Sequence, residues 1–297
     1  MLYKNLSSYL KERYGKKIKK LCIDGGFSCP NRDGRCGVGG CVFCGERGAG
    51  EHIDPTLSIG EQVREGLSHG TAEGYIAYFQ NFTNTYATPE VLRERYDAAL
   101  IDERIVALAI GTRPDCIDEE IAALIAEYKS RLDVWVELGL QTSSDKTAKR
   151  INRGYDSAVF ERAMEILTRH GIPVVVHLII GLPGEGDAEL AATVDLINRY
   201  PLFGVKIHSL YVSKGTRLAE EYRRGEFSPI TLEEYVERAA YALTHIRPEL
   251  VVHRITGDCP RGMLVAPEWN SDKNAVIAAI NQRLASHGER QGCYYRK

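Results

Sequence analysis

The chain has 297 residues, of which 44% are hydrophobic and 26% are charged, and its formal net charge is −2. This composition excludes a disordered chain. No apolar run approaches the roughly 20 residues that a membrane-spanning helix needs, and the polar amino terminus lacks the apolar core of a signal peptide, so we expect a cytoplasmic protein. We expect one main domain over residues 1–225 and a carboxyl-terminal extension over 226–297 that packs on it.

Short apolar runs rich in β-branched residues alternate with helical patterns through most of the chain. A helical pattern over residues 3–14 ends at Gly15. Strands are then predicted at 18–23, 75–80, 104–110, 133–138, 174–180 and 204–210, and helices at 58–68, 89–101, 117–129, 155–170 and 187–199. Beyond about 225 we expect a helix at 231–245, a strand at 249–255, a loop, and a helix at 272–286. Strand–helix alternation repeated about six times predicts a parallel sheet, either open or curled into a partial barrel.

Polar or glycine-rich segments follow each of the six predicted strands. The first strand is followed by the cysteine loop (residues 24–54), and the later ones by "NFTNT", "GTRPD", "GLQTS", "GLPGE" and "YVSKGT". Both candidate folds place their chemistry at the carboxyl ends of the strands. We therefore expect these six segments to surround one binding cavity.

The cysteine loop contains the stretch "CPNRDGRCGVGGCVFC", residues 29–44. In a long cytoplasmic chain such clustering favours a metal centre over disulfides. A CxxC pair such as Cys41 and Cys44 occurs in zinc sites and in iron–sulfur sites. No second pair at zinc-site spacing follows downstream, which favours iron–sulfur but leaves zinc and inert thiols open. Spacing alone would add Cys36 as the third ligand.

Six basic residues lie within the ten positions 11–20: Lys11, Arg13, Lys16, Lys17, Lys19 and Lys20. A solvated helix end is one interpretation of this stretch. The other is a contact with the phosphates of a nucleic acid.

The motifs "CPNRDG", "GGCVFC", "YFQNFTNTY", "VELGLQT", "HLIIGLPGE", "KIHSLYVSKGT" and "LVAPEWN" occur in one order over roughly residues 15–292. In this the chain resembles short bacterial radical S-adenosylmethionine (SAM) proteins, which belong to the broader class that includes the catalytic subunit of elongator. The resemblance implies a partial (β/α)6 barrel of the TIM type with an amino-terminal helix and a carboxyl-terminal α+β extension. It also implies a [4Fe–4S] cluster, SAM, and an electron donor such as flavodoxin or ferredoxin.

Members of this family have been linked to modification of the wobble uridine of tRNA. The resemblance therefore implies an enzyme that reductively cleaves SAM to a 5′-deoxyadenosyl radical and modifies tRNA. A radical SAM enzyme acting on a small metabolite or peptide is the first alternative. A non-catalytic, zinc-stabilised RNA-binding module is an alternative of another class.

The resemblance also assigns residues to the cluster. It implies the ligands Cys29, Cys41 and Cys44, in place of the set that spacing alone favours. Cys22 and Cys36 are then expected to be unligated.

For SAM, the resemblance implies contacts along the rim of the barrel. Phe43 is expected near the adenine, Gln141 near the ribose, and Arg153 at the methionine carboxylate, where an arginine fork would be the strongest available contact. The remaining expected contacts are Thr83, Asn84 and Thr85 near the methionine amino group and Ile179 and Gly181 on the adenine side.

Candidate substrate contacts are less specific. The basic residues Lys16, Lys17, Lys19 and Lys20 are candidates for tRNA phosphates. Arg113 and His208 are candidates inside the cavity, and His177 is a further one.

Overall fold

The computed structural model describes residues 1–48, 53–54, 56–260 and 262–296. Its main sheet is parallel, with the strand order β1-β2-β3-β4-β5-β6-β8. The strands are β1 (Ile18–Ile23), β2 (Gly74–Phe79), β3 (Ile105–Thr112), β4 (Asp133–Gln141), β5 (Val174–Ile180), β6 (Gly204–Ser209) and β8 (Val251–Arg254). A short antiparallel pair, β7 (Val212–Ser213) and β9 (Leu264–Ala266), lies apart from it.

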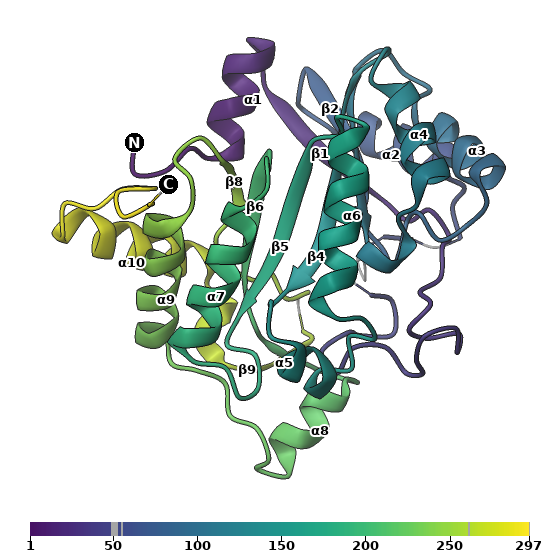
Figure 1. Cartoon of the computed structure of the whole chain (residues 1–297). Coiled ribbons are helices and arrows are strands. Elements are labelled where there is room, and N and C mark those ends of the chain that lie inside the picture. Colours follow the sequence, from purple (N-terminus) through teal and green to yellow (C-terminus); the bar gives the residue numbers. More distant parts are fainter. Residues whose placement is uncertain (49–52, 55, 261, 297) are drawn as a thin grey trace.

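Most of the helices cover the outer face of this curled sheet (Figure 1). The helices are α1 (Leu6–Tyr14), α2 (Ile59–Ser68), α3 (Pro89–Ala99), α4 (Glu119–Tyr128), α5 (Asp145–Arg150), α6 (Ser157–Arg169), α7 (Asp187–Asn198), α8 (Arg217–Arg223), α9 (Leu232–His245) and α10 (Lys273–Ser286). Two short 3-10 turns, Pro114–Cys116 and Glu268–Ser271, complete the elements. The predicted α/β partial barrel is confirmed.

Two features of the fold were not expected. The strand predicted at 249–255 forms β8 and joins the main sheet beside β6, with Val205 paired to Val252. One hydrophobic core also includes residues of the barrel helices together with Val276 and Ile280 of α10. The segment after 225 is therefore part of the same sheet and core, and the domain boundary at 225 stays a prediction.

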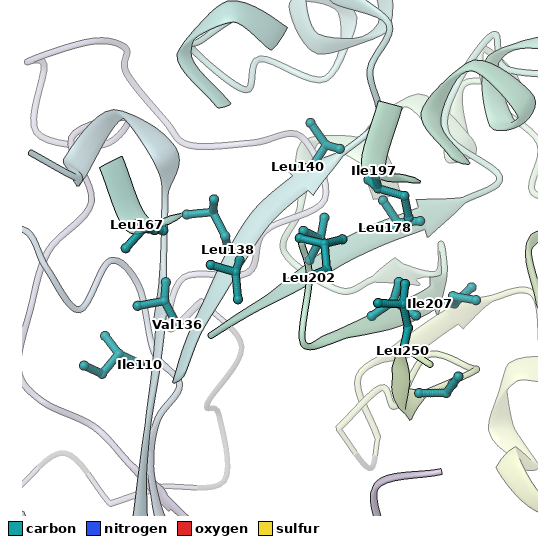
Figure 2. Close-up of a cluster of buried hydrophobic side chains, with 14 of the residues drawn as sticks. Ile110, Val136, Leu138, Leu140, Leu167, Leu178, Ile197, Leu202, Ile207 and Leu250 are labelled. Carbon is teal, nitrogen blue, oxygen red and sulfur yellow. The ribbon is translucent and has the colours of Figure 1, made fainter. Parts of the chain in front are cut away.

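The strands alternate between an outer and an inner face, as β4 illustrates. Its apolar residues Val136, Leu138 and Leu140 point outward into the main core, where they meet side chains from the helices (Figure 2). Because successive strand residues point to opposite faces, Glu137 and the residues two apart from it point into the barrel. The interior is thus lined by a different and more polar set of residues.

Helix α1 closes the amino end of the barrel. Asn5 caps its start, and Gly15 ends it in the left-handed conformation. Leu10 packs inside the barrel against a small cluster that includes Trp135, and the Tyr14 hydroxyl donates to Asp133 Oδ2 at 2.6 Å. The carboxyl ends of the strands lie at the opposite end of the barrel, together with the cysteine loop. Within the described residues no helix is long and apolar enough to cross a membrane.

Candidate active site in the barrel cavity

A cavity of about 640 Å³ extends through the barrel from the cysteine loop to α1. Its wall combines loop residues at the carboxyl end, inward side chains of the strands, and Leu6, Ser7 and Leu10 of α1. The volume lies in the range of pockets that hold a drug-sized ligand. Residues of five of the six strand-end segments line this cavity, whereas none of the segment "GLPGE", residues 181–185, does.

Three thiols of the cysteine loop lie on this cavity wall. They belong to Cys29, Cys41 and Cys44, and all three are free. A hydrogen bond between Cys41 and Cys44 raises the pKa of Cys41 and lowers that of Cys44. Cys22 lines the cavity deeper along β1, while Cys36 is exposed and does not line it.

The cysteine loop is held in a close-fitting arrangement by its polar residues. Asn31 donates to the Asn152 carbonyl at 2.5 Å and contacts Cys41 Sγ at 3.8 Å. A Cβ on Gly37 would stand 2.0 Å from Asn31 Oδ1, so only glycine fits there. Arg32 donates to the Gly45 and Glu46 carbonyls.

The donor set of the loop suits a cluster better than a single ion. The thiols of Cys29, Cys41 and Cys44 are soft sulfur donors on one wall of the cavity. A cubane is wider than an ion and takes thiolate ligands. Three free thiols on one cavity wall therefore fit an iron–sulfur cluster.

Cys36 has other partners. Its thiol donates to Asp115 Oδ2 at 3.6 Å and receives a contact from Arg113 Nη2 at 3.5 Å. Arg113 forms a two-point ion pair with Asp115 and donates to the Arg153 carbonyl at 2.9 Å. Arg113 thus lies on the cavity wall as expected, but its guanidinium already braces the loop.

Arg153 is fully buried and lines the cavity. Its guanidinium donates to the backbone carbonyls of Leu140, Thr142 and Tyr155. Nη2 has no hydrogen-bond partner although it is shielded from solvent, and its ion-pair contact with Asp145 Oδ1 is long, at 3.9 Å. A buried donor without a partner is costly, so Nη2 is available for an anionic group of a ligand.

We expect Arg153→Ala to leave iron content unchanged and to weaken SAM binding. A charge-assisted hydrogen bond to a carboxylate is worth about 1.5–3 kcal/mol, or roughly 10- to 150-fold in affinity. Calorimetry on the reconstituted protein measures this. Because Arg153 also binds three carbonyls, Arg153→Lys serves as a control that keeps the charge. Equal affinity of the alanine variant and the parent protein would contradict the assignment.

Four other residues expected at SAM also lie on the cavity wall: Phe43, Thr83, Gln141 and Ile179. Thr83 Oγ1 is buried without a partner. Gln141 has φ +61°, an unusual conformation for this residue type, and accepts a hydrogen bond from the Tyr155 hydroxyl at 3.2 Å. A strained residue held in this way is typical of ligand sites.

The other three residues expected at SAM do not line this cavity, and their contact with SAM stays a prediction. The Asn84 amide donates to the carbonyls of Phe79 and Gly111 and so joins β2 to β3. Thr85 bonds Thr112 and lines a second cavity of about 460 Å³ outside the barrel. Gly181 has φ +94° and packs against Ile230. Each is used by the fold itself.

The basic stretch is not one surface. Lys16 and Lys17 precede β1 at the amino end of the barrel, the end opposite the cysteine loop. Lys19 is exposed on the outer face of β1. Lys20 instead lines the cavity, and its ammonium contacts Glu137 Oε1 at 2.8 Å. The alternation of a strand separates neighbours that the sequence groups together.

Glu137 is the centre of a buried ionic cluster that sequence patterns did not single out. Its side chain is 0% exposed and pairs with Lys20 and Lys206, and His177 Nε2 lies 2.9 Å from Oε2. Burial opposes its ionisation, but Lys20 and Lys206 hold the pKa of Glu137 well below its ordinary value. Each of the apolar runs "VWVEL" and "GVKIH" contains one charged residue, and this feature of the sequence could have indicated a buried ionic cluster.

Histidines and a tyrosine complete this cluster. Burial lowers the pKa of His177 and of His253 to about 4, so both are neutral near pH 7. His208 also lines the cavity, 5.6 Å from His177 between ring centres, and its Nε2 has no partner. The Tyr78 hydroxyl accepts from Lys206 at 2.9 Å. The expected position of His208 in the cavity agrees with the structure.

The parallel partial barrel, with thiols at the carboxyl ends of its strands, defines a cofactor-dependent barrel enzyme. The family model of the Radical SAM superfamily matches residues 32–197, and that of the Radical SAM C-terminal domain matches residues 203–286. The chain belongs to the radical SAM superfamily. Its cofactors are a [4Fe–4S] cluster and SAM, and it is an enzyme, which sets aside the zinc-stabilised binding module.

Individual relatives agree with this assignment. The chain is 41% identical over 281 residues to protein YhcC of Escherichia coli strain K12, covering 94% of this chain and 91% of that protein. It is 33% identical over 166 residues to the tRNA uridine(34) acetyltransferase of Methanocaldococcus infernus, covering 54% of this chain and 30% of that protein. The solved structure of Elp3 from the same archaeon shares the fold, with a TM-score of 0.69 at 21% identity, and covers 92% of this chain and 64% of that one.

Proposed function

We propose that this enzyme modifies a uridine of tRNA by radical SAM chemistry. The observation that carries the proposal is the similarity to a tRNA uridine(34) acetyltransferase, at 33% identity over 166 residues, which are 54% of this chain and 30% of that protein. Cys29, Cys41 and Cys44 would hold the cluster, which when bound would supply the electron for reductive cleavage of SAM. The electron would come from a donor such as flavodoxin or ferredoxin.

The residues of this chain have distinct parts in the proposal. We assign the cluster to Cys29, Cys41 and Cys44, and the methionine carboxylate to Arg153 Nη2. Thr83 Oγ1 is a buried group without a partner that can accept from the methionine ammonium. The closed amino end of the barrel excludes water from the reacting atoms. An enzyme acting on a small metabolite or peptide would use the same cofactor residues.

The mouth of the barrel offers a surface for RNA. Helices α5 and α8 lie beside the carboxyl ends of the strands (Figure 1) and are joined by the ion pair Arg150–Glu221 at 2.6 Å. Exposed Lys146 and Lys149 lie on α5, and exposed Lys214 precedes α8. These three residues, which we call the rim lysines, are near the cavity mouth. Lys16, Lys17 and Lys19 lie at the other end of the barrel or outside it.

Changing the three rim lysines to glutamine should weaken tRNA binding and flatten its dependence on salt. Each lost phosphate contact lowers the slope of log affinity against log salt concentration by about one. Lys16, Lys17 and Lys19 changed together to glutamine remove the same charge and should have the smaller effect. Fluorescence anisotropy of labelled tRNA measures both. A larger effect of the Lys16, Lys17 and Lys19 changes than of the rim-lysine changes would instead place the RNA contact at the basic stretch 11–20.

Nucleoside analysis of tRNA from a deletion strain tests the function itself. We expect one uridine-derived nucleoside to disappear or its precursor to accumulate. The parent gene should restore the pattern, and the Cys29→Ser variant should not. Unchanged nucleosides in the deletion strain would favour the small-molecule alternative.

A further inference from the structure

The buried ionic cluster lies deeper than the residues assigned to the cofactors. Glu137 precedes Gln141 by four residues on β4, which is roughly 13 Å along a strand. Lys206 precedes His208 by two residues on β6, and both point inward. The cluster therefore lies on the floor of the cavity, where a part of the substrate would enter.

The charges on this floor do not balance. When both lysines are protonated, Lys20 and Lys206 bring two positive charges, and Glu137 brings one negative charge. His177 and His253 are neutral near pH 7 because burial lowers their pKa. One positive charge is left without a counter-charge, with the Lys206 side chain only 6% exposed. A buried charge without a partner is costly.

The same imbalance affects Lys206 itself. Burial lowers the pKa of Lys206 to about 7, although Glu137 opposes this shift. The cluster thus stabilises the protonated form of Lys206 only weakly, as expected where a second anion is missing. Arg254, a neighbour on β8, is already paired with Asp258 at 3.5 Å, as is Lys273 at 3.2 Å. The charge of Asp258 is therefore not available to the floor.

Hydrogen-bond donors are also left over on the floor. Lys206 donates to Tyr78 and Glu137, and Lys20 to Glu137, so each ammonium keeps at least one further N–H. The His208 Nε2 is buried without a hydrogen-bond partner. The ring nitrogens of His253 also lack a hydrogen bond, although Nδ1 lies 3.8 Å from Glu137 Oε1, and this neutral imidazole offers one donor and one acceptor. The His253 side chain is 0% exposed, which rules out solvent as its partner.

We propose that the substrate of this enzyme carries a carboxylate, which binds on the cavity floor between Lys20, Lys206 and His208. A carboxylate brings the single negative charge that the floor lacks and two oxygens for the unused donors. A phosphate monoester would bring nearly two negative charges and reverse the imbalance. The carboxylate belongs either to the side chain of the uridine or to a separate small acid. This inference rests on the proposed radical chemistry of the same cavity.

Acetate is the probe for the site. Binding of 13C-labelled acetate to the anaerobically reconstituted full chain is followed by ligand-observed NMR. We expect saturable binding that Lys206→Met weakens by about tenfold or more. Lys206→Met should still fold, because Glu137 keeps Lys20 as its partner. Lys20→Met tests the second ammonium, and Lys206→Arg should retain binding. Lys19→Met, on the outer face of β1, is the matched control and should leave binding unchanged.

Two further ligands separate the sources of the carboxylate. If 5-carboxymethyluridine binds about tenfold more tightly than acetate and uridine does not compete, the carboxylate belongs to the base. Equal binding of acetate and the nucleoside assigns it to a small acid. The proposal fails if acetate does not saturate, if Lys206→Met binds it like the parent, or if phosphate displaces acetate at equal concentration.

Failure of this inference can be told from failure of the proposed function. Release of 5′-deoxyadenosine by the reduced enzyme is measured in the same samples. If release persists and acetate does not bind, the carboxylate site is wrong and the radical chemistry stands. If acetate binds through Lys206 but tRNA nucleosides are unchanged in the deletion strain, the RNA substrate is wrong and the site stands.

Discussion

Replacing Cys29 by serine should remove both the iron and the visible absorbance of the cluster from the reconstituted protein. Cys29 lies on the same cavity wall as Cys41 and Cys44, at the end of the short stretch that follows β1. In the Cys29→Ser variant, only Cys41 and Cys44 would remain to hold the cubane, and the covalent link to the ligand farthest from them in the sequence would be lost. Iron is counted per chain by a colorimetric assay after anaerobic reconstitution, beside the absorbance spectrum.

Cys36→Ser is the matched control for this prediction. Cys36 lies only seven positions after Cys29 in the sequence. Its thiol, however, contacts Asp115 and Arg113, and the residue is exposed. We expect the Cys36→Ser variant to keep its iron and its spectrum. Loss of the cluster in this variant, together with its retention in Cys29→Ser, would show that the shorter cysteine spacing is the correct one.

Replacing Glu137 by glutamine should lower the free energy of unfolding by about 3–5 kcal/mol, because it leaves the buried Lys206 ammonium and the partly exposed Lys20 ammonium without a counter-charge. Lys206→Met is the matched control, since it leaves Glu137 paired with Lys20, and we expect a clearly smaller loss. Urea unfolding under anaerobic conditions, followed by tryptophan fluorescence, measures both. Equal losses of unfolding free energy in the Glu137→Gln and Lys206→Met variants would mean that the cavity floor has no positive charge in excess.

The same cluster should make stability depend on pH. Burial lowers the pKa of His177 and His253 from the ordinary 6.5 to about 4. Between these values the unfolded chain binds protons that the folded chain does not, so stability is present above about pH 6.5 and is lost as the pH falls toward 4. The depressed pKa of Glu137 adds a further loss at still lower pH. We expect His253→Gln to reduce the slope of unfolding midpoint against pH in this window.

The repeating strand–helix pattern, and the end of the barrel at which the site lies, could be predicted from the amino-acid sequence alone. Apolar runs such as 174–180 and 204–210 correspond closely to β5 and β6, because buried parallel strands carry continuous apolar residues. The cysteine loop follows the first strand in the sequence, and such folds place their chemistry at the carboxyl ends of the strands, so this loop was expected at the site. The cofactors were predicted from the family motifs, and residues of these motifs line the cavity.

Which polar residues share that cavity could not be predicted without the three-dimensional structure. Lys20, Glu137 and Lys206 are far apart in the chain and meet because three strands turn the same alternate residues inward. The same alternation sends Lys19 outside and separates it from Lys20. Asn84 was expected at SAM, but the fold uses its amide to join β2 and β3. Adjacency in sequence does not say which side of a curled sheet a side chain occupies, or which backbone groups need its hydrogen bonds.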